Sequence, residues 1–519
     1  MHQFLIRSAH RWGGAVAVAE EETSSTFEQI ARRALSLAAS FADRGLEKGD
    51  RVALLMPKST EAIISLFGAL LAGGIYVPVD LRWPADRIEL ALAECAPRFV
   101  VAMDLGDLAR QIPSMARIGG IADSSITILD MKAGKSLPWV ETLGRSETGF
   151  SIPEIAPGDP ALILFTSGSS GRPKGVALSH KAVSAFVRWS SQEFKLGTED
   201  RLASPSSLSF DLSTFDIFNM AWCGATCVIV PESIVWMPRF LAQFISLQRI
   251  TAWYSVPSVL SALLAEKSFA QKSYPDLRLA VFAGEVLSGR DLARARTILP
   301  RADFYNLYGP TETNVVTWYR VPAGFDPDCP IPIGRACPYA ELMFDPAGVE
   351  KEGRTETGDL LVAGDSLMLG YWNRPAETER AFVAIGEGNG KRFYRTGDRV
   401  ARDPATGDFV FVGRKDRQVK RRGYRIELGE IENALRRHPQ ILDAAVISTR
   451  DGEMRTSIGA FACHDPHSGI SAVEVRTHCA RYLPAYMMPD QVVFLRVLPR
   501  NSRGKTDYAA LESLLQDLS

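Results

Sequence analysis

The stretch from Ala62 to Val79 constrains the fold most, because its nearly continuous apolar run approaches the length of a membrane span. Gly73, Gly74 and Pro78 divide that run. The glycines are placed to end a helix that Thr60 can cap, and the residues after them are typical of a buried strand. The sequence therefore predicts a helix followed by a strand of a soluble protein, and we expect no membrane partner.

Similar apolar runs, bounded by turn residues, recur along the chain and alternate with helical patterns. With Arg51 to Met56 in front of it, the divided run forms a strand-helix-strand unit of a parallel sheet. The other predicted strands are Ile75 to Val79, Ala161 to Phe165, Val176 to Leu178, Thr226 to Val230, Ala252 to Val256 and Arg278 to Phe282. Together these predict an α/β fold, with residues 106–157 as irregular connections.

The pattern changes to short strands with turn signals after Glu341, and it changes again after Asp416. The supporting segments are the strands Gly358 to Ala363 and Asp408 to Gly413, then the helix Glu430 to Arg437 and the strand Leu442 to Ser448. A chain of 519 residues is long for one core. We predict a large N-terminal domain, residues 1–415, that includes a β-rich subdomain, and a small domain, residues 416–519.

Charge and cysteine content exclude several classes of protein. The formal net charge of -1 argues against a nucleic-acid partner, although the basic run Lys415 to Arg425 is typical either of a local patch or of a solvated face. Seven cysteines without a CxxC pair indicate reduced thiols and a cytoplasmic protein. Arg7, His10 and Arg11 interrupt the only apolar start, so no secretory signal is predicted.

A glycine- and hydroxyl-rich loop between two predicted strands, from Thr166 to Gly175, is the strongest local motif. Its backbone N–H groups and hydroxyls can surround phosphate oxygens while Lys174 supplies positive charge. It lacks the spacing of a P-loop kinase or GTPase, and as a bare pattern it is also typical of a plain connection. The residues that contact phosphate in this interpretation are Thr166, Ser167, Gly168, Ser169, Ser170, Gly171 and Lys174.

Read with the rest of the chain, this loop resembles the phosphate loop of the adenylate-forming superfamily, which includes acyl-CoA synthetases, luciferases and nonribosomal-peptide adenylation domains. The other motifs follow in the order of that family. They are Leu71 to Asp80, Phe210 to Ser213, Asn306 to Glu312, Tyr394 to Asp398, Gly413 to Asp416, Arg425 to Glu432, Leu483 to Pro489 and Gly504-Lys505. The resemblance implies α/β sheets in the large domain and a mobile α+β C-terminal domain.

The family resemblance implies ATP and Mg²⁺ as cofactors and assigns catalytic groups. Lys505 is the catalytic lysine, Thr311 a phosphate donor and Glu312 the magnesium ligand. After the first reaction, the family rotates its small domain about a hinge, here Asp416, which withdraws the lysine and opens a tunnel for a thiol.

The same resemblance identifies a nucleotide site. Tyr308 offers a flat face for adenine, Asp398 has acceptor oxygens for the ribose hydroxyls, and Arg414 adds contacts to ribose or phosphate. The remaining nucleotide-binding residues are Gly284, Glu285, Asn306 and Gly309, with Thr311 and Lys505 again.

Asp211 distinguishes an amino-acid substrate from a simple acid, because a buried ammonium group needs a carboxylate partner. It follows Phe210 where amino-acid-activating members of the family carry this aspartate. The side-chain pocket implied by the resemblance is formed by Leu212, Phe215, Tyr254, Val281, Ala283, Leu307, Val315 and Val316. This apolar set resembles the pockets of freestanding L-proline ligases of pyrrole-forming pathways, which belong to secondary-metabolite and antibiotic biosynthesis.

We therefore expect a ligase that activates L-proline and loads it onto a phosphopantetheinylated carrier protein in trans, since no carrier motif follows Lys505. L-Alanine, pipecolate and other small amino acids remain alternatives. An acyl- or aryl-CoA ligase would share every motif except the role of Asp211. A non-catalytic nucleotide-binding or scaffolding relative is a further alternative, disfavoured because Lys505, Glu312 and Asp398 are all present.

Overall fold

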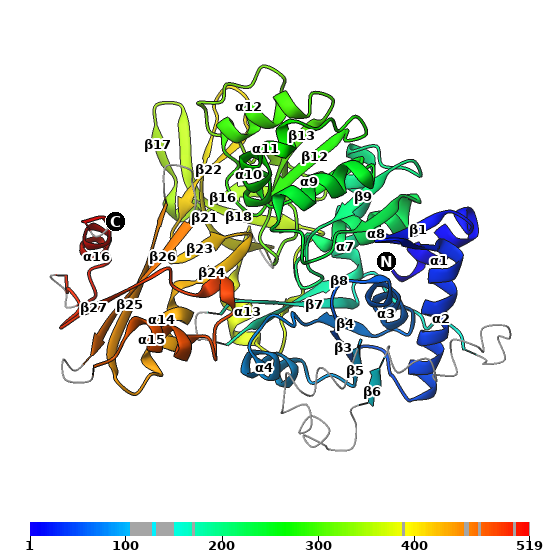
Figure 1. Ribbon diagram of the computed structural model, residues 1–519, viewed down its shortest axis with the longest axis horizontal. Helices are drawn as coiled ribbons and strands as arrows, with labels where there is room; N and C mark the ends of the chain where they lie inside the picture. Colours follow the sequence, from blue (N-terminus) through cyan, green and yellow to red (C-terminus); the bar gives the residue numbers. More distant parts are fainter. Residues whose placement is uncertain are drawn as a thin grey trace.

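The structure of the 519-residue chain is a computed structural model. The structure describes residues 1–103, 127–130, 150–168, 172–386, 390–450, 456–464, 469–501 and 505–517. Two large sheets, a β-rich subdomain and a small C-terminal domain make up this part of the chain, and Figure 1 shows the C-terminal elements gathered on one side of the molecule.

One large sheet contains seven strands, most of them parallel, as the apolar runs predict. In spatial order they are β19 (Gly370–Tyr371), β8 (Lys174–Ser179), β7 (Pro160–Thr166), β4 (Ile75–Pro78), β3 (Arg51–Leu55), β5 (Phe99–Ala102) and β6 (Thr127–Asp130). The prediction of irregular structure for 106–157 is wrong at β6, a four-residue strand that extends the sheet edge beside β5. Most of that segment, 106–126 and 131–149, lies outside the described residues.

The divided apolar run forms α3 (Thr60–Leu71) and then β4, which confirms the predicted helix and strand. The cap is Ser59 rather than Thr60: the Ser59 hydroxyl accepts the Ala62 N–H, whereas Thr60 is the first helical residue and its hydroxyl bonds to Glu20. No helix in the described ranges is long and apolar enough to traverse a lipid bilayer.

The second large sheet contains nine strands. In spatial order they are β15 (Arg335–Ala336), β14 (Thr317–Arg320), β13 (Asp303–Tyr308), β12 (Leu279–Ala283), β11 (Ala252–Ser255), β9 (Arg201–Ser204), β10 (Thr226–Ile229), β1 (Val16–Glu20) and β2 (Thr23–Thr26). The strands β11, β12 and β13 run parallel, so their carboxyl ends meet at one edge, where a binding cleft is expected.

Helices separate the two sheets and cover their outer faces. They are α1 (His2–Trp12), α2 (Phe27–Asp43), α4 (Ala85–Cys95), α7 (His180–Glu193), α8 (Ser213–Cys223), α9 (Pro238–Leu247), α10 (Pro257–Ala265), α11 (Lys267–Ala270), α12 (Gly289–Ile298) and α13 (Pro375–Ala381). Between the sheets, Phe67 of α3 meets Phe218 of α8 edge to face, with ring centroids 5.6 Å apart. This buried layer holds the two halves of the large domain together.

A β-rich subdomain follows, as predicted from the short strands with turn signals after Glu341. Its six strands are β16 (Ala340–Phe344), β17 (Glu350–Glu352), β18 (Thr355–Gly364), β20 (Phe382–Ile385), β21 (Lys391–Arg402) and β22 (Phe409–Arg414). The carboxyl end of β22 leads the chain into Asp416 and the C-terminal domain.

The C-terminal domain has α+β character and an apolar core of its own, built around Ile426, Ile431 and Ile458. Its elements are β23 (Gln418–Arg421), β24 (Tyr424–Glu427), α14 (Leu428–Arg436), β25 (Ile441–Arg450), β26 (Thr456–His464), α15 (Ala472–Cys479), β27 (Gln491–Leu495) and α16 (Tyr508–Asp517). The hairpin β23–β24 extends from this core towards the large domain (Figure 1).

The layer between the sheets gives a first prediction. Replacing Phe67 by Ala should lower the free energy of unfolding by about 3–5 kcal/mol, because the buried ring leaves a cavity beside Phe218. Chemical denaturation followed by tryptophan fluorescence measures the change. Leu247→Ala, at a side chain that is 70% exposed, is the control and should shift stability by less than about 0.5 kcal/mol. Equal effects of the two changes would contradict the assigned core.

Candidate active site

The turn of the hairpin β23–β24 is the part of the C-terminal domain that enters the cleft of the large domain. Arg422 and Gly423 both have positive φ, 53° and 80°, as a tight two-residue hairpin turn requires. A Cβ atom on Gly423 would lie 2.5 Å from Cγ1 of Val256, so only glycine fits there. The Gly423 N–H donates to a carboxylate oxygen of Glu285 at 2.7 Å, which joins the turn to the loop after β12.

Tyr308 and Arg414, the last residues of β13 and β22, meet Asp398 of the interior of β21. The Tyr308 hydroxyl donates to Asp398 at 2.5 Å, and Arg414 forms an ion pair with the other oxygen of this buried carboxylate. Burial raises the pKa of Tyr308 well above its ordinary range, so the hydroxyl stays a donor. The structure thus brings together three residues that the sequence assigned to one nucleotide site.

Asp416, the predicted hinge, lies directly beside this cluster. Arg414 donates to Asp416 through Nε at 2.7 Å and to Gln418 through Nη2 at 2.7 Å. Gln418 also accepts from Arg425. The junction between the domains therefore shares a cation network with the Asp398 carboxylate.

Glu312 is almost completely buried and has two partners from different parts of the chain. The Tyr371 hydroxyl donates to one oxygen at 2.8 Å, and Arg425 of the hairpin donates to the other at 2.7 Å. Burial alone raises the pKa of Glu312, but the charge of Arg425, hydrogen bonds from a backbone N–H and from Tyr371, and the charge of Lys174 together lower that pKa below the ordinary value. Glu312 is therefore an ionised buried carboxylate.

An ionised single carboxylate fits Mg²⁺, which commonly uses one or two protein carboxylates and takes its remaining ligands from phosphates and water. Within the described ranges, no group of three or more His, Cys, Asp or Glu side chains could form a cage around a metal ion. Glu312 therefore suits a magnesium site with a single protein carboxylate, once Arg425 has moved away from that carboxylate.

The phosphate loop between β7 and β8 contacts the C-terminal domain. A Cβ atom on Gly168 would lie 2.1 Å from the carbonyl oxygen of Arg172, so the loop closes tightly only with glycine there. Ser167 donates to the carbonyl of Arg425 at 2.7 Å, and the Gly168 N–H lies 3.3 Å from a Glu430 oxygen. Lys174 lies over the Tyr371 ring. Ser169, Ser170 and Gly171 lie outside the described residues.

A small cavity of about 100 Å³ connects the predicted amino-acid and nucleotide residues. Of the predicted residues, Thr166, Ser167, Phe210, Asp211, Leu212, Tyr254, Ala283, Gly284, Gly309, Thr311, Val315, Asp398 and Arg414 line it. Burial raises the pKa of Asp211, and a hydrogen bond from the Thr311 hydroxyl opposes this shift. Asp211 is the acidic residue next to the apolar wall, as the amino-acid interpretation requires.

Four predicted pocket residues do not line this cavity. Phe215 packs behind Tyr254 with ring centroids 5.1 Å apart, and Val281 and Leu307 belong to the same buried cluster. Val316 is fully buried in a different cluster, which contains Tyr308. Side chains of consecutive residues in extended backbone point in opposite directions, so Val316 points away from the cavity that Val315 lines. The placement of Val316 in the side-chain pocket is therefore not supported by its contacts.

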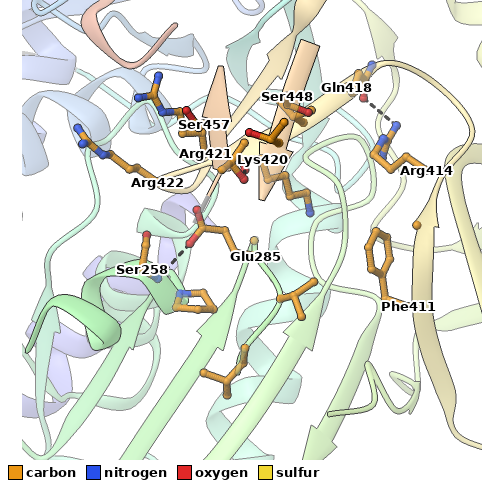
Figure 2. A pocket seen from close by; sticks show the side chains of 18 of the residues that line it. Ser258, Glu285, Phe411, Arg414, Gln418, Lys420, Arg421, Arg422, Ser448 and Ser457 are labelled. Atoms are coloured by element: carbon orange, nitrogen blue, oxygen red, sulfur yellow. Dashed lines mark hydrogen bonds between the residues drawn. The ribbon is translucent and has the colours of Figure 1, made fainter. Parts of the chain in front are cut away.

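A larger cavity of about 1,450 Å³ lies between the two domains (Figure 2). Lys420 points into it between Glu285 on one wall and Phe411 and Arg414 on the other. Asn306 and Tyr308 also line this space, with the Asn306 amide held by the Pro332 carbonyl at 2.9 Å. Arg421 and Arg422 of the hairpin line the cavity as well, so it lies between the hairpin and the residues Tyr308 and Arg414 that contact Asp398.

Lys505, the predicted catalytic lysine, is not brought into either cavity. Its side chain is exposed, and its backbone exchanges hydrogen bonds with Asn501 in the C-terminal domain. The hairpin supplies Lys420 and Arg425 to the site instead. The structure thus shows an arrangement in which the hairpin, rather than Lys505, faces the site.

Comparison with known proteins decides the family. The profile described as AMP-binding enzyme matches residues 5–372, and that of the AMP-binding enzyme C-terminal domain matches 430–505. The chain belongs to the AMP-binding enzyme family. It is 37% identical to an L-proline–L-prolyl-carrier-protein ligase of Streptomyces coelicolor, covering 94% of this chain and 91% of that protein. A ligase of the same name from Pseudomonas fluorescens is 35% identical, over 98% of both chains.

A solved structure supports the same fold. The Vibrio cholerae adenylation domain AlmE, in complex with glycyl-adenosine-5'-phosphate, matches with a TM-score of 0.80 at 26% identity, over 99% of this chain and 97% of that one. The large α/β domain and the small α+β domain of this AMP-binding enzyme are therefore those of an adenylation domain.

Sequence reasoning missed several residues that shape the site of this AMP-binding enzyme. Lys420, Tyr424 and Arg425 belong to the basic run that was also typical of a solvated face, yet all three line the small cavity. Arg87 of α4 lines it too. The motif Arg425 to Glu432 was the available signal, but a motif alone does not reveal which side chains cross to the other domain.

The Asp398 cluster gives a second prediction. Asp398→Asn should weaken AMP binding by about 10- to 100-fold, the equivalent of about 1.5–3 kcal/mol for hydrogen bonds to a charged group. Isothermal titration with AMP measures it. Asp403→Asn is the control, because Asp403 accepts hydrogen bonds within its own surface turn, from the backbone N–H groups of Ala405 and Thr406. Equal AMP affinity in the two variants would contradict the nucleotide role of Asp398.

Proposed function

We propose that this AMP-binding enzyme activates L-proline with ATP, forms L-prolyl-AMP and pyrophosphate, and transfers the prolyl group to the phosphopantetheine thiol of a separate carrier protein. The observation that carries the proposal is Asp211, a half-buried carboxylate that lines one cavity with the apolar side chains of Leu212, Tyr254, Ala283 and Val315 and with Asp398 and Arg414. The two ligase relatives, similar over nearly their whole length, support proline as the amino acid.

In the proposed first step, a carboxylate oxygen of proline attacks the α-phosphorus of ATP, and the bond from that phosphorus to the bridging oxygen breaks. Pyrophosphate leaves with both electrons of that bond. Asp211 holds the substrate ammonium group, while Lys174 and the backbone of the phosphate loop offset phosphate charge. Lys505 comes into the site for this step and offsets charge on the attacking carboxylate and the α-phosphate.

Mg²⁺, with Glu312 as its protein ligand, would supply further neutralisation of phosphate charge. We assign Thr311 to the α-phosphate; its position in the same cavity as Asp211, to which it donates, supports this role. Tyr308 and Asp398 are proposed to hold adenine and ribose, with Asn306, Gly284, Glu285 and Gly309 forming the adjoining walls.

In the proposed second step, the carrier thiolate attacks the carbonyl carbon of prolyl-AMP, the carbon–oxygen bond to AMP breaks, and AMP leaves as the phosphate anion. The thiol proton passes to solvent. The large cavity between the domains fits the pantetheine arm, because it adjoins the small cavity: both are lined by Gly284, Arg414 and Lys420. We propose Asp416 as the hinge between domains 1–415 and 416–519. Rotation about it brings Lys505 to the site for the first step and the hairpin for the second.

The setting of the reaction is also part of the proposal. All seven cysteines are free, which supports a reducing cytoplasm. Carrier-bound proline is a typical starting material for pyrrole groups, so we place the enzyme in secondary-metabolite biosynthesis of the antibiotic-forming type.

ATP–pyrophosphate exchange tests the substrate. L-Proline should support exchange with a kcat/KM at least about tenfold above L-alanine and L-pipecolate, because one methylene in an apolar pocket changes binding by about 1–3 kcal/mol. Simple carboxylic acids should support none. Exchange that is indifferent to proline would contradict the proposal, and exchange driven by an acyl or aryl acid would favour a CoA ligase.

Asp211 gives a prediction with a defined pH dependence. Burial raises the pKa of Asp211, so its carboxylate forms only at higher pH than an exposed aspartate, and the KM for proline should fall as pH rises through that pKa. Asp211→Asn should remove this dependence. It should also lower kcat/KM by about 30- to 1,000-fold, the equivalent of about 2–4 kcal/mol for an unpaired buried ammonium.

The control for that experiment is Asp365→Asn, whose half-exposed carboxylate forms a surface ion pair with Lys181. It should retain the wild-type pH profile. An Asp211→Asn enzyme with the same profile and the same KM for proline would show that another group binds the substrate ammonium.

A further inference from the structure

Arg87 and Glu430 form an ion pair across the boundary between the two domains. Arg87 lies in α4 of the large domain and Glu430 in α14 of the C-terminal domain, and the two side chains are only 4% and 3% exposed. The guanidinium also lies over the Trp83 ring, 5.0 Å from its centroid. Burying two charges is unfavourable unless they remain paired, so this contact depends on the present arrangement of the domains.

The second oxygen of Glu430 reaches the phosphate loop. Oε2 accepts the Gly168 N–H at 3.3 Å, while Oε1 receives Arg87. Next to this contact, Ser167 donates to the carbonyl of Arg425. Glu430 therefore places an anionic oxygen on a backbone N–H of the loop whose sequence is suited to phosphate oxygens.

Nothing in the proposed chemistry uses Arg87 or Glu430, yet their position links them to it. An N–H group and a guanidinium that share one carboxylate are also the donors that an anionic phosphate oxygen requires. When the C-terminal domain turns away, Glu430 leaves with it. The Gly168 N–H and the Arg87 guanidinium then lack their shared carboxylate partner. A phosphate oxygen and Glu430 are then alternative partners for the same pair of donors.

We propose that Arg87 and Glu430 are positioning residues for the transfer step, with Glu430 standing in the place of an ATP phosphate oxygen on Gly168. The inference rests on the proposed two-step function. Glu430 holds the hairpin, and with it Gly423 and Arg425, against the site while the thiol reacts. The same contact excludes the phosphates of ATP, so the paired arrangement and bound ATP are mutually exclusive.

The binding test compares ATP with AMP by isothermal titration, without any amino acid. Glu430→Gln should bind ATP about tenfold more tightly, because the arrangement that competes with its phosphates becomes less populated. Affinity for AMP, which lacks the β- and γ-phosphates, should change less than about twofold. Glu432→Gln is the matched control, since Glu432 lies on the same helix but pairs with Arg417 inside the C-terminal domain.

The kinetic test separates the two steps. Pyrophosphate exchange with proline should persist in Glu430→Gln, whereas single-turnover formation of prolyl-pantetheine from free pantetheine should slow by about tenfold or more. Arg87→Gln should behave in the same way. The double variant should be no slower than either single variant, because both changes break one interaction. Arg87→Lys, which keeps the charge, should recover much of the transfer rate.

Three results would overturn the proposal. One is an ATP affinity in Glu430→Gln equal to that of Glu432→Gln. Another is a transfer rate that falls only in proportion to exchange. The third is additivity of the effects of Arg87→Gln and Glu430→Gln in the double variant. The titrations need no amino acid, so a failure of the proline assignment, seen as absent exchange in the wild type, is distinguishable from a failure of the Arg87–Glu430 assignment.

Discussion

The ion pair between Arg425 and Glu312 is the interaction on which the observed arrangement depends. Glu312 is 1% exposed, and a carboxylate in that position needs a cation. In the structure the cation is supplied by the hairpin of the C-terminal domain, 113 residues further along the chain. Because the partner belongs to another domain, satisfying this one buried charge fixes where the hairpin, its turn and the helix behind it must lie.

The remaining contacts of the hairpin follow from that placement. Gly423 meets Glu285 and Val256, Tyr424 stacks on Tyr486 with ring centroids 3.5 Å apart, and Glu430 reaches Gly168. The same placement leaves Lys505 exposed. The two proposed reactions at one site need different groups for each, and the proposed rotation of the C-terminal domain would exchange the hairpin for Lys505.

The sequence predicted the parts of this molecule that are encoded locally. The divided run at Ala62 to Val79 gave a helix and a strand because glycines end helices, and Tyr308, Asp398 and Arg414 were recognised through their motifs. The errors have local physical causes as well. Ser59 rather than Thr60 caps α3, and β6 is too short and isolated to be distinguished from loop by its pattern.

The interdomain contacts could not be predicted in this way. Nothing in the spacing of Arg87 and Glu430, 343 residues apart, indicates that they touch, and the basic run containing Lys420 and Arg425 equally resembled an exposed face. Val316 was assigned to the pocket, but it faces the Tyr308 cluster because extended residues alternate. Side chains that depend on the placement of one domain against another require the structure.

A structure of the enzyme crystallised with a non-hydrolysable ATP analogue, Mg²⁺ and L-proline tests the central claim most directly. We expect Arg425 to leave Glu312, the hairpin turn at Gly423 to withdraw from Glu285, and Lys505 to lie beside the α-phosphate. The claim is contradicted if Arg425 still pairs with Glu312 while the triphosphate occupies the phosphate loop.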